Sequence, residues 1–318
     1  MAVEDSNLDR AILSGDDSAQ LAPKAQSRLL FEYKYPMGLD ANSVRFLIAA
    51  RKQGAQFNRT IMLGRQHFFV PPALVCDFMA RQGLASDGLE AAIKTSVFAE
   101  PFFQALGASQ VDSMDHAEFE GANHIHDLNQ PIPDAWKEQF NVVFDGGTME
   151  HVFNFPMALR SAMEMLKKDG RLFIHTPVNN TSGHGFYQFS PELFYGALSP
   201  ENGFEVERLV LHRTGPYGRW YQVSNSDVIR ERVELITFTP IMALVQARRV
   251  EVKPIFQKWP QQAIYADLWQ AGKGNEKTHW FRVAFPRLAR WLSPFRTAAK
   301  FYTRQSLSNR RYFTPVDK

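Results

Sequence analysis

Two histidines stand in segments that have the composition of loops and follow apolar runs. His151 comes directly after Glu150, a few residues beyond the run 141–145, and His184 lies in the polar stretch 179–188. An imidazole changes charge near neutral pH, so either side chain can take a proton from a hydroxyl or an amine. The alternative for each is a hydrogen bond to backbone or a helix cap. We predict His184 and His151 as catalytic residues.

Acidic and glycine residues also collect where apolar runs end. Asp115, Asp127 and Asp145 each close such a run, Gly146 follows the last of them, and Gly64 closes an earlier one. Carboxylate oxygens accept hydrogen bonds from hydroxyl and amine donors, so these positions suit a ligand that carries both. The alternative is that the aspartates start turns and cap helices.

The order of apolar runs and helical segments predicts the elements that would position these residues. Short strands are expected at 60–64, 111–115, 124–127, 141–145 and 171–175, with helical segments at 72–81, from 83 to 107 and at 157–168. Strands that alternate with helices through short loops form a parallel sheet. Ligands of such sheets bind at the carboxyl ends of the strands. Beyond residue 203, the runs 204–210, 233–237 and 241–245 predict further strands, the last two as an antiparallel pair.

The segment 140–177, FNVVFDGGTMEHVFNFPMALRSAMEMLKKDGRLFIHTP, resembles the fourth strand, following helix and fifth strand of class I S-adenosylmethionine-dependent methyltransferases. The resemblance covers roughly residues 58–248. It implies a doubly wound, mostly parallel α/β sheet of the Rossmann-like methyltransferase fold, with S-adenosyl-L-methionine as cofactor. It further implies that Asp115 holds the ribose hydroxyls and Asp127 the adenine amino group, and that Gly64, Asp145 and Gly146 also contribute to the cofactor site.

The loop after the first strand departs from that family. Where members carry several glycines, this chain has Gly64, Arg65 and Gln66. We predict that Arg65 supplies a bidentate fork to the cofactor's carboxylate; the alternative is that it points to solvent or pairs with a neighbouring acid. The predicted function is methyl transfer to an oxygen or nitrogen of a small-molecule acceptor. The alternative is a methyltransferase-like binding or scaffold protein without turnover.

No metal site is expected. His124 and His126 would share one face of a strand, but that strand should be buried. No third His, Cys, Asp or Glu follows at a sequence spacing typical of metal ligands. The single cysteine, Cys76, sits in an apolar run and excludes a disulfide framework.

The net charge of +3 gives no reason to expect a nucleic-acid partner. The polar N-terminus is unlike a secretory signal, and no run approaches the ~18 apolar residues of a membrane span, so we expect a cytoplasmic protein.

Three regions are expected: an arm and helix (1–57), the α/β domain (58–250) and a basic aromatic extension (251–318). Residues 277–318 hold ten Lys and Arg against Asp317 alone. Phe281, Phe285, Leu288, Leu292 and Phe295 fall at helical spacing, although Pro286 and Pro294 would break or kink a helix. This extension suits a membrane surface or an acidic partner; alternatively its aromatics pack on the domain.

Overall fold

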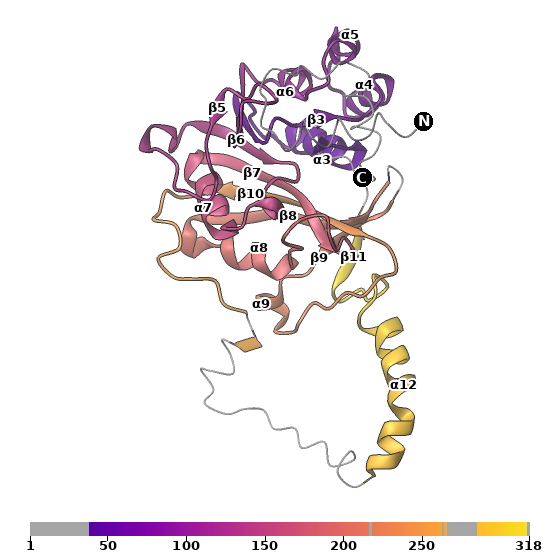
Figure 1. Cartoon of the computed structure of the whole chain (residues 1–318). Coiled ribbons are helices and arrows are strands. Elements are labelled where there is room, and N and C mark those ends of the chain that lie inside the picture. Colours follow the sequence, from indigo (N-terminus) through magenta and orange to yellow (C-terminus); the bar gives the residue numbers. More distant parts are fainter. Residues whose placement is uncertain (1–37, 216–217, 263, 266–284, 317–318) are drawn as a thin grey trace, which may run out of the picture. The chain divides into compact units, whose positions relative to one another are not determined.

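The computed structural model describes residues 38–215, 218–262, 264–265 and 285–316 (Figure 1). Within them, nine strands form one sheet in the order β11-β9-β8-β10-β7-β6-β2-β4-β5. The strands are β2 (Arg59–Leu63), β4 (Gln110–Asp115), β5 (His124–Ile125), β6 (Phe140–Asp145), β7 (Leu166–Asn179), β8 (Phe204–Arg213), β9 (Trp220–Val223), β10 (Ile241–Arg249) and β11 (Phe313–Val316). A separate small sheet pairs β1 (Gly38–Leu39) with β3 (His67–Phe68).

Five neighbouring strands of the large sheet, β5, β4, β2, β6 and β7, are parallel to one another. The remaining pairings, from β7 through β10, β8 and β9 to β11, are antiparallel. The predicted parallel sheet is therefore confirmed for the half that carries β2, β4, β5, β6 and β7. Because β10 is antiparallel to both of its neighbours, β8 runs in the same direction as β7.

Helices cover both faces of the sheet, as a doubly wound fold requires (Figure 1). The helices of the described residues are α3 (Ala41–Lys52), α4 (Pro72–Arg81), α5 (Leu89–Lys94), α6 (Glu100–Ala105), α7 (Phe155–Met165), α8 (Pro191–Ala197), α9 (Ser226–Ile229) and α12 (Pro286–Thr303), with short 3-10 turns η1 (Asp134–Trp136), η2 (Met149–His151) and η3 (Pro200–Asn202).

The alternation of side chains along the strands divides the core in two. Met62 of β2 packs in the cluster that includes α3, α4 and α6. Its neighbours Ile61 and Leu63 pack in the other cluster, with α7 and α8. All three side chains are fully buried. A central strand covered on both faces explains why the run 61–63 is continuously apolar.

Local sequence signals set the ends of several helices. Asp40 caps α3, because its side chain accepts hydrogen bonds from the backbone N–H groups of Asn42 and Ser43 at 3.0 and 2.8 Å. Pro72 begins α4, and a proline in the first turn of a helix costs no hydrogen bond. The predicted helix at 72–81 is confirmed.

Two predicted elements differ in the structure. The helix expected at 157–168 ends at Met165, and Leu166 already begins β7; the turn at Asp169 has a φ of 64° and lies within that strand. The strand expected at 233–237 is wrong, because this segment has no regular structure. Both edges of β10 are occupied by β7 and β8, so the segment has no strand to pair with.

The end of the chain contributes both to the core and to the surface. The helix α12 continues through Pro294, where a break or kink was expected, and Leu288, Trp291 and Phe295 on it are exposed. Phe281, expected to share its spacing, lies outside the described residues. Tyr312 and Phe313 are buried, and β11 pairs with β9. None of the helices in the described residues combines the length and the apolar composition of a membrane span.

Candidate active site

The order of the strands reverses at β2. After β2 the chain continues to β4 and β5 on one side, and then returns to β6 on the other side of β2. The crevice at the carboxyl ends of β2 and β6 is therefore the switch point at which doubly wound folds bind ligands. Gly64 follows β2 and Gly146 follows β6, so the two predicted glycines meet at this point.

The side chain of Gln66 lies between these glycines. A Cβ atom on Gly146 would meet Gln66 Oε1 at 2.4 Å, and one on Gly64 would meet Thr148 Oγ1 at 2.7 Å and Gln66 Nε2 at 3.0 Å. Gln66 donates to the carbonyl oxygen of Leu63 and to Thr148 Oγ1, whereas its own Oε1 is buried without a hydrogen-bond partner. The glycines thus admit Gln66, and an unpaired acceptor remains in the crevice.

Arg65 is paired inside the protein. Its Nε donates to Glu100 Oε1 at 2.7 Å, one terminal nitrogen donates to the carbonyl oxygen of Glu120 at 2.7 Å, and the guanidinium lies 4.0 Å from the centre of the Phe98 ring. Pairing with a neighbouring acid was one of the two alternatives for this residue. The role of Arg65 toward a cofactor carboxylate stays a prediction.

Asp115 and Asp127 stand at the predicted edge but differ in their hydrogen bonds. Asp115 is the last residue of β4, and it accepts from the N–H of His116 at 2.6 Å. Asp127 follows β5, and its Oδ1 accepts from the backbone and the side chain of Asn129 at 2.9 and 2.7 Å. These two hydrogen bonds lower the pKa of Asp127, so the group stays ionised. Both carboxylates can accept from ligand donors.

Asp145 is fully buried at the end of β6. Its Oδ1 accepts from the N–H groups of Thr148 and Met149 at 2.9 and 3.3 Å, and its Oδ2 has no hydrogen-bond partner. Burial, and next the charge of Glu150, raise the pKa of Asp145 well above the ordinary value. The carboxyl group shapes the loop after β6, and its contact with a cofactor stays a prediction.

The two predicted catalytic histidines are brought together. His151 ends the turn η2 after β6, His184 lies in the loop after β7, and their ring centres are 5.2 Å apart. Glu150 lies beside them, with Oε1 3.7 Å from His184 Nε2. Parallel neighbouring strands end at the same edge of the sheet, which is why residues 33 positions apart in the sequence meet here.

Contacts of the backbone hold the His184 loop against η2. The carbonyl oxygen of Glu150 accepts from the N–H groups of Phe186 and Tyr187 at 2.9 and 3.2 Å. A Cβ atom on Gly185 would lie 2.9 Å from that oxygen, so this approach requires glycine. The hydroxyl of Tyr187 donates to the carbonyl oxygen of Phe153 at 2.7 Å.

Glu150 was not selected by sequence reasoning, although it was noted beside His151. Its side chain is 0% exposed, Oε2 accepts from Thr176 Oγ1 at 3.1 Å, and Oε1 has no hydrogen-bond partner. Desolvation lowers the pKa of His151, Glu150 acts in the opposite direction, and His184 adds to the lowering. The neutral imidazole that can accept a proton is therefore favoured at His151.

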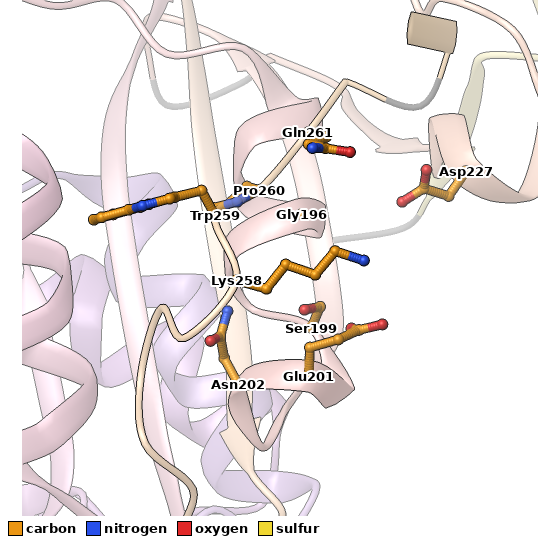
Figure 2. Close-up of a pocket in the computed structure, with 9 residues that line it drawn as sticks. All are labelled: Gly196, Ser199, Glu201, Asn202, Asp227, Lys258, Trp259, Pro260 and Gln261. Atoms are coloured by element: carbon orange, nitrogen blue, oxygen red, sulfur yellow. The ribbon is translucent and has the colours of Figure 1, made fainter. Parts of the chain in front are cut away.

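A second candidate site lies at the opposite edge of the sheet (Figure 2). It is a pocket of about 180 Å³ near η3, which directly precedes β8, and Figure 2 shows the side chain of Lys258 extending across it. Its lining residues are Gly196, Ser199, Glu201, Asn202, Asp227, Lys258, Trp259, Pro260 and Gln261. This volume is below the roughly 300 Å³ of the smallest usual ligand sites. We favour the carboxyl edge because the fold brings the polar side chains of Glu150, His151 and His184 together there.

The residues at the carboxyl edge fit S-adenosylmethionine by their chemistry. The carboxylates of Asp115 and Asp127 suit its hydroxyl and amine donors, and the unpaired Oε1 of Gln66 offers a buried acceptor between Gly64 and Gly146. Bound at this edge, S-adenosylmethionine would supply an electrophilic methyl group.

No protein-family model matches the chain, and no curated protein matches it. Among solved structures, it is similar to a branched-chain polyamine synthase mutein from Thermus thermophilus (15% identity, 71% of this chain and 60% of the synthase, TM-score 0.36). It is also similar to an S-adenosylmethionine-dependent methyltransferase from Mesorhizobium loti (14%, 66% and 98%, 0.36) and to one described as a putative methyltransferase from Bacillus halodurans (13%, 64% and 99%, 0.33). The chain spans about 60% of the length of the polyamine synthase. The fold assignment depends on the strand order of this chain, and these likenesses carry no argument about its activity.

Proposed function

We propose that this chain transfers a methyl group from S-adenosylmethionine to an oxygen or nitrogen of a small-molecule acceptor. The observation that supports the proposal is the shared edge of the sheet. The switch point between β2 and β6, the carboxylate at the end of β4 and the His151–His184 pair all lie there. A sulfonium methyl group needs mainly alignment with its acceptor, so a fold that brings two binding regions to one edge suffices.

In this proposal Asp115 binds the ribose hydroxyls, Asp127 binds the adenine amino group, and His184 or His151 takes the proton from the acceptor. Glu150 stabilises the imidazolium that forms, because its buried Oε1 lies 3.7 Å from His184 Nε2.

The surroundings of the histidines favour an acceptor with an apolar part. Phe153 and Phe186 lie two residues beyond His151 and His184, their ring centres are 6.1 Å apart, and both are exposed. Exposed aromatic pairs beside a polar cluster are typical of binding sites.

Calorimetry with S-adenosylmethionine tests the cofactor assignment. Asp127→Ala should weaken binding by about 1–3 kcal/mol, because a ligand donor loses its acceptor. Asp87→Ala, which removes an exposed aspartate of another loop, is the control and should bind normally. Equal affinity in wild type and Asp127→Ala would remove the assignment. Formation of S-adenosylhomocysteine with mixtures of alcohol and amine acceptors then tests turnover.

The alternative is a binding or scaffold protein, and the position of Gln66 favours it. If the Gln66 side chain keeps the crevice closed, S-adenosylmethionine should produce neither heat of binding nor a thermal shift. Gln66→Ala should then restore binding. That result would support a closed crevice in the wild type and would contradict the proposed transfer.

We further propose that α12 contacts an anionic membrane surface. Leu288, Trp291, Phe295 and Tyr302 are separated by three, four and seven residues, so they share one face of the helix, and all are exposed. No acidic residue occurs from Pro286 to Arg304, which include five Lys and Arg. An exposed apolar face on a cationic helix suits the interface of a bilayer with anionic lipids.

Co-sedimentation with vesicles of phosphatidylserine and phosphatidylcholine tests this contact. Binding should fall steeply with salt, and Trp291→Ala with Phe295→Ala should reduce it. Trp259→Ala is the matched control, since Trp259 and Trp291 are both 66% exposed. Absence of sedimentation at low salt would contradict the proposal and leave an acidic protein partner as the alternative.

A further inference from the structure

Glu150, His151 and His184 have the composition and the spacing of a metal-ligand set. Each offers one ligand atom, and these atoms all lie within 4.8 Å of one another. In the described part of the chain, no other group of three His, Cys, Asp or Glu side chains brings its ligand atoms this close together.

A second observation indicates that something belongs between these side chains. Glu150 is 0% exposed, yet its Oε1 has no hydrogen-bond partner. A buried carboxylate oxygen without a partner is costly, because it has lost its water and gained nothing in return. That oxygen points to His184 Nε2 at 3.7 Å, which is beyond a hydrogen bond.

We propose that Glu150, His151 and His184 bind a divalent first-row transition metal ion of the zinc type. Two imidazoles and one carboxylate suit such an ion better than Mg²⁺ or Ca²⁺, which prefer oxygen ligands only. Three protein ligands leave one position of a tetrahedral site open, as in catalytic zinc centres. The metal site is independent of the proposed methyl transfer, but an imidazole nitrogen that binds the ion cannot also take the acceptor's proton, so a bound metal would replace the general-base role proposed above.

The distances are compatible with such an ion after small side-chain movements. Ligand atoms around tetrahedral Zn²⁺ lie about 3.4 Å apart, given bonds of roughly 2.0–2.1 Å. The observed 3.7 Å between Glu150 Oε1 and His184 Nε2 is close to this value. His151 is exposed, so its ring can turn toward the other two.

Neighbouring groups support Glu150 as a ligand. Thr176 Oγ1 donates to its second oxygen at 3.1 Å and thereby fixes the carboxylate, as hydrogen bonds behind metal ligands usually do. An ion pair between Glu150 and a protonated His184 is the competing explanation.

His124 and His126, whose spacing in the sequence resembles that of metal ligands, are not part of the cluster. Both rings pack against Trp136, at 5.1 and 5.5 Å between ring centres. His126 Nε2 lies 3.2 Å from the carbonyl oxygen of Gln130.

Titration of the chelator-treated full chain with Zn²⁺ and with Co²⁺ tests the proposal without cofactor or acceptor. We expect one equivalent to bind, and Co²⁺ to give the visible absorption of a four-coordinate site. His184→Ala, His151→Ala and Glu150→Gln should each weaken binding at least about tenfold. His126→Ala is the matched control and should bind as the wild type does.

Two results would overturn the metal site: binding of no equivalent at micromolar metal, or equal affinity in the wild type and in His184→Ala and His151→Ala. Because Glu150 is buried, circular dichroism should confirm that Glu150→Gln is folded. The exposed His151→Ala keeps the test decisive if it is not. Failure of methyl transfer with intact metal binding would leave this inference standing.

Discussion

The two loops at the switch point differ in how completely they use their own polar groups. After β2, the Arg65 guanidinium forms an ion pair with Glu100, donates to a backbone carbonyl oxygen and contacts an aromatic ring. The unpaired buried atom of this loop is the side-chain oxygen of Gln66. After β6, two buried carboxyl groups, those of Asp145 and Glu150, each have an oxygen without a hydrogen-bond partner.

The unpaired oxygens indicate where a bound ligand would stabilise the protein. A loop whose charged group is already neutralised gains little from a ligand, whereas buried unpaired oxygens are stabilised by any cation or donor that reaches them. The loop after β2 is therefore expected to respond to mutation mainly through folding. The loop after β6 should respond through binding.

Gly146→Ala should have the largest effect on folding, because Gly146, although it follows β6, packs against Gln66 of the loop after β2. Its Cβ would lie 2.4 Å from Gln66 Oε1 and 2.8 Å from the Phe144 ring, so the free energy of unfolding should fall by about 1–3 kcal/mol. Urea unfolding measures this loss. Repeating it in a Gln66→Ala background should recover part of the loss, since one of the two clashes is removed. An unchanged loss would mean that Gln66 does not fill the crevice.

Thr176→Val tests the loop after β6. The substitution removes the donor to Glu150 Oε2, and a buried carboxylate with one fewer partner should cost about 1–2 kcal/mol in metal-free protein. Zn²⁺ should recover part of this stability, because it binds the folded state. Melting temperatures with and without Zn²⁺ give both values. If Zn²⁺ stabilised Thr176→Val equally when His184→Ala is also present, the stabilisation would not come from the cluster of Glu150, His151 and His184.

Much of this arrangement could be predicted from the sequence, because it depends on local pattern. Apolar runs predicted the positions of β2, β4, β6 and the core of β7, and the parallel order then placed both histidine loops at one edge. The strands β9 and β11 were not predicted, since each has only four residues and they pair with each other from distant parts of the chain.

The details of the site could not be predicted in the same way. That Gln66 turns between two glycines, and that Glu150 points inward while His151 is exposed, depends on side-chain direction in loops. No periodicity records that direction. The adjacent positions of Glu150 and His151 were the one sequence signal that both residues belong to the site.

Arg65→Ala should lower the free energy of unfolding less than Gly146→Ala or Thr176→Val does. The guanidinium is partly exposed and pairs with Glu100, so its loss should cost about 1 kcal/mol. We expect equal changes in affinity for S-adenosylmethionine and for adenosine, because Arg65 supports the loop. Calorimetry with both ligands checks this. Selective loss of the carboxylate-bearing cofactor, greater in Arg65→Ala than in Arg65→Lys, would restore the bidentate role predicted from the sequence.

Asp145→Asn should change the free energy of unfolding least of these substitutions at low pH. Its effect should grow as the pH rises. Burial and then Glu150 raise the pKa of Asp145 above the ordinary 3.8, so the folded state holds this proton more tightly than the unfolded chain. Between the ordinary and the raised pKa, the unfolded chain gives up the proton as pH increases, and the wild type loses stability. Asparagine keeps the acceptor for Thr148 and Met149 but does not titrate.

The stability of Asp145→Asn relative to wild type should therefore become more favourable from about pH 4 upward. Urea unfolding in the presence of a chelator, at several pH values, measures the difference. Asp87→Asn, at an exposed position, should show no such trend. Glu150→Gln removes the second cause of the raised pKa, so in that background the pH dependence of the difference should shrink. A difference that stays constant with pH would mean that the Asp145 carboxyl group is already ionised in the folded protein, and that the loop after β6 tolerates more buried charge than its unpaired oxygens indicate.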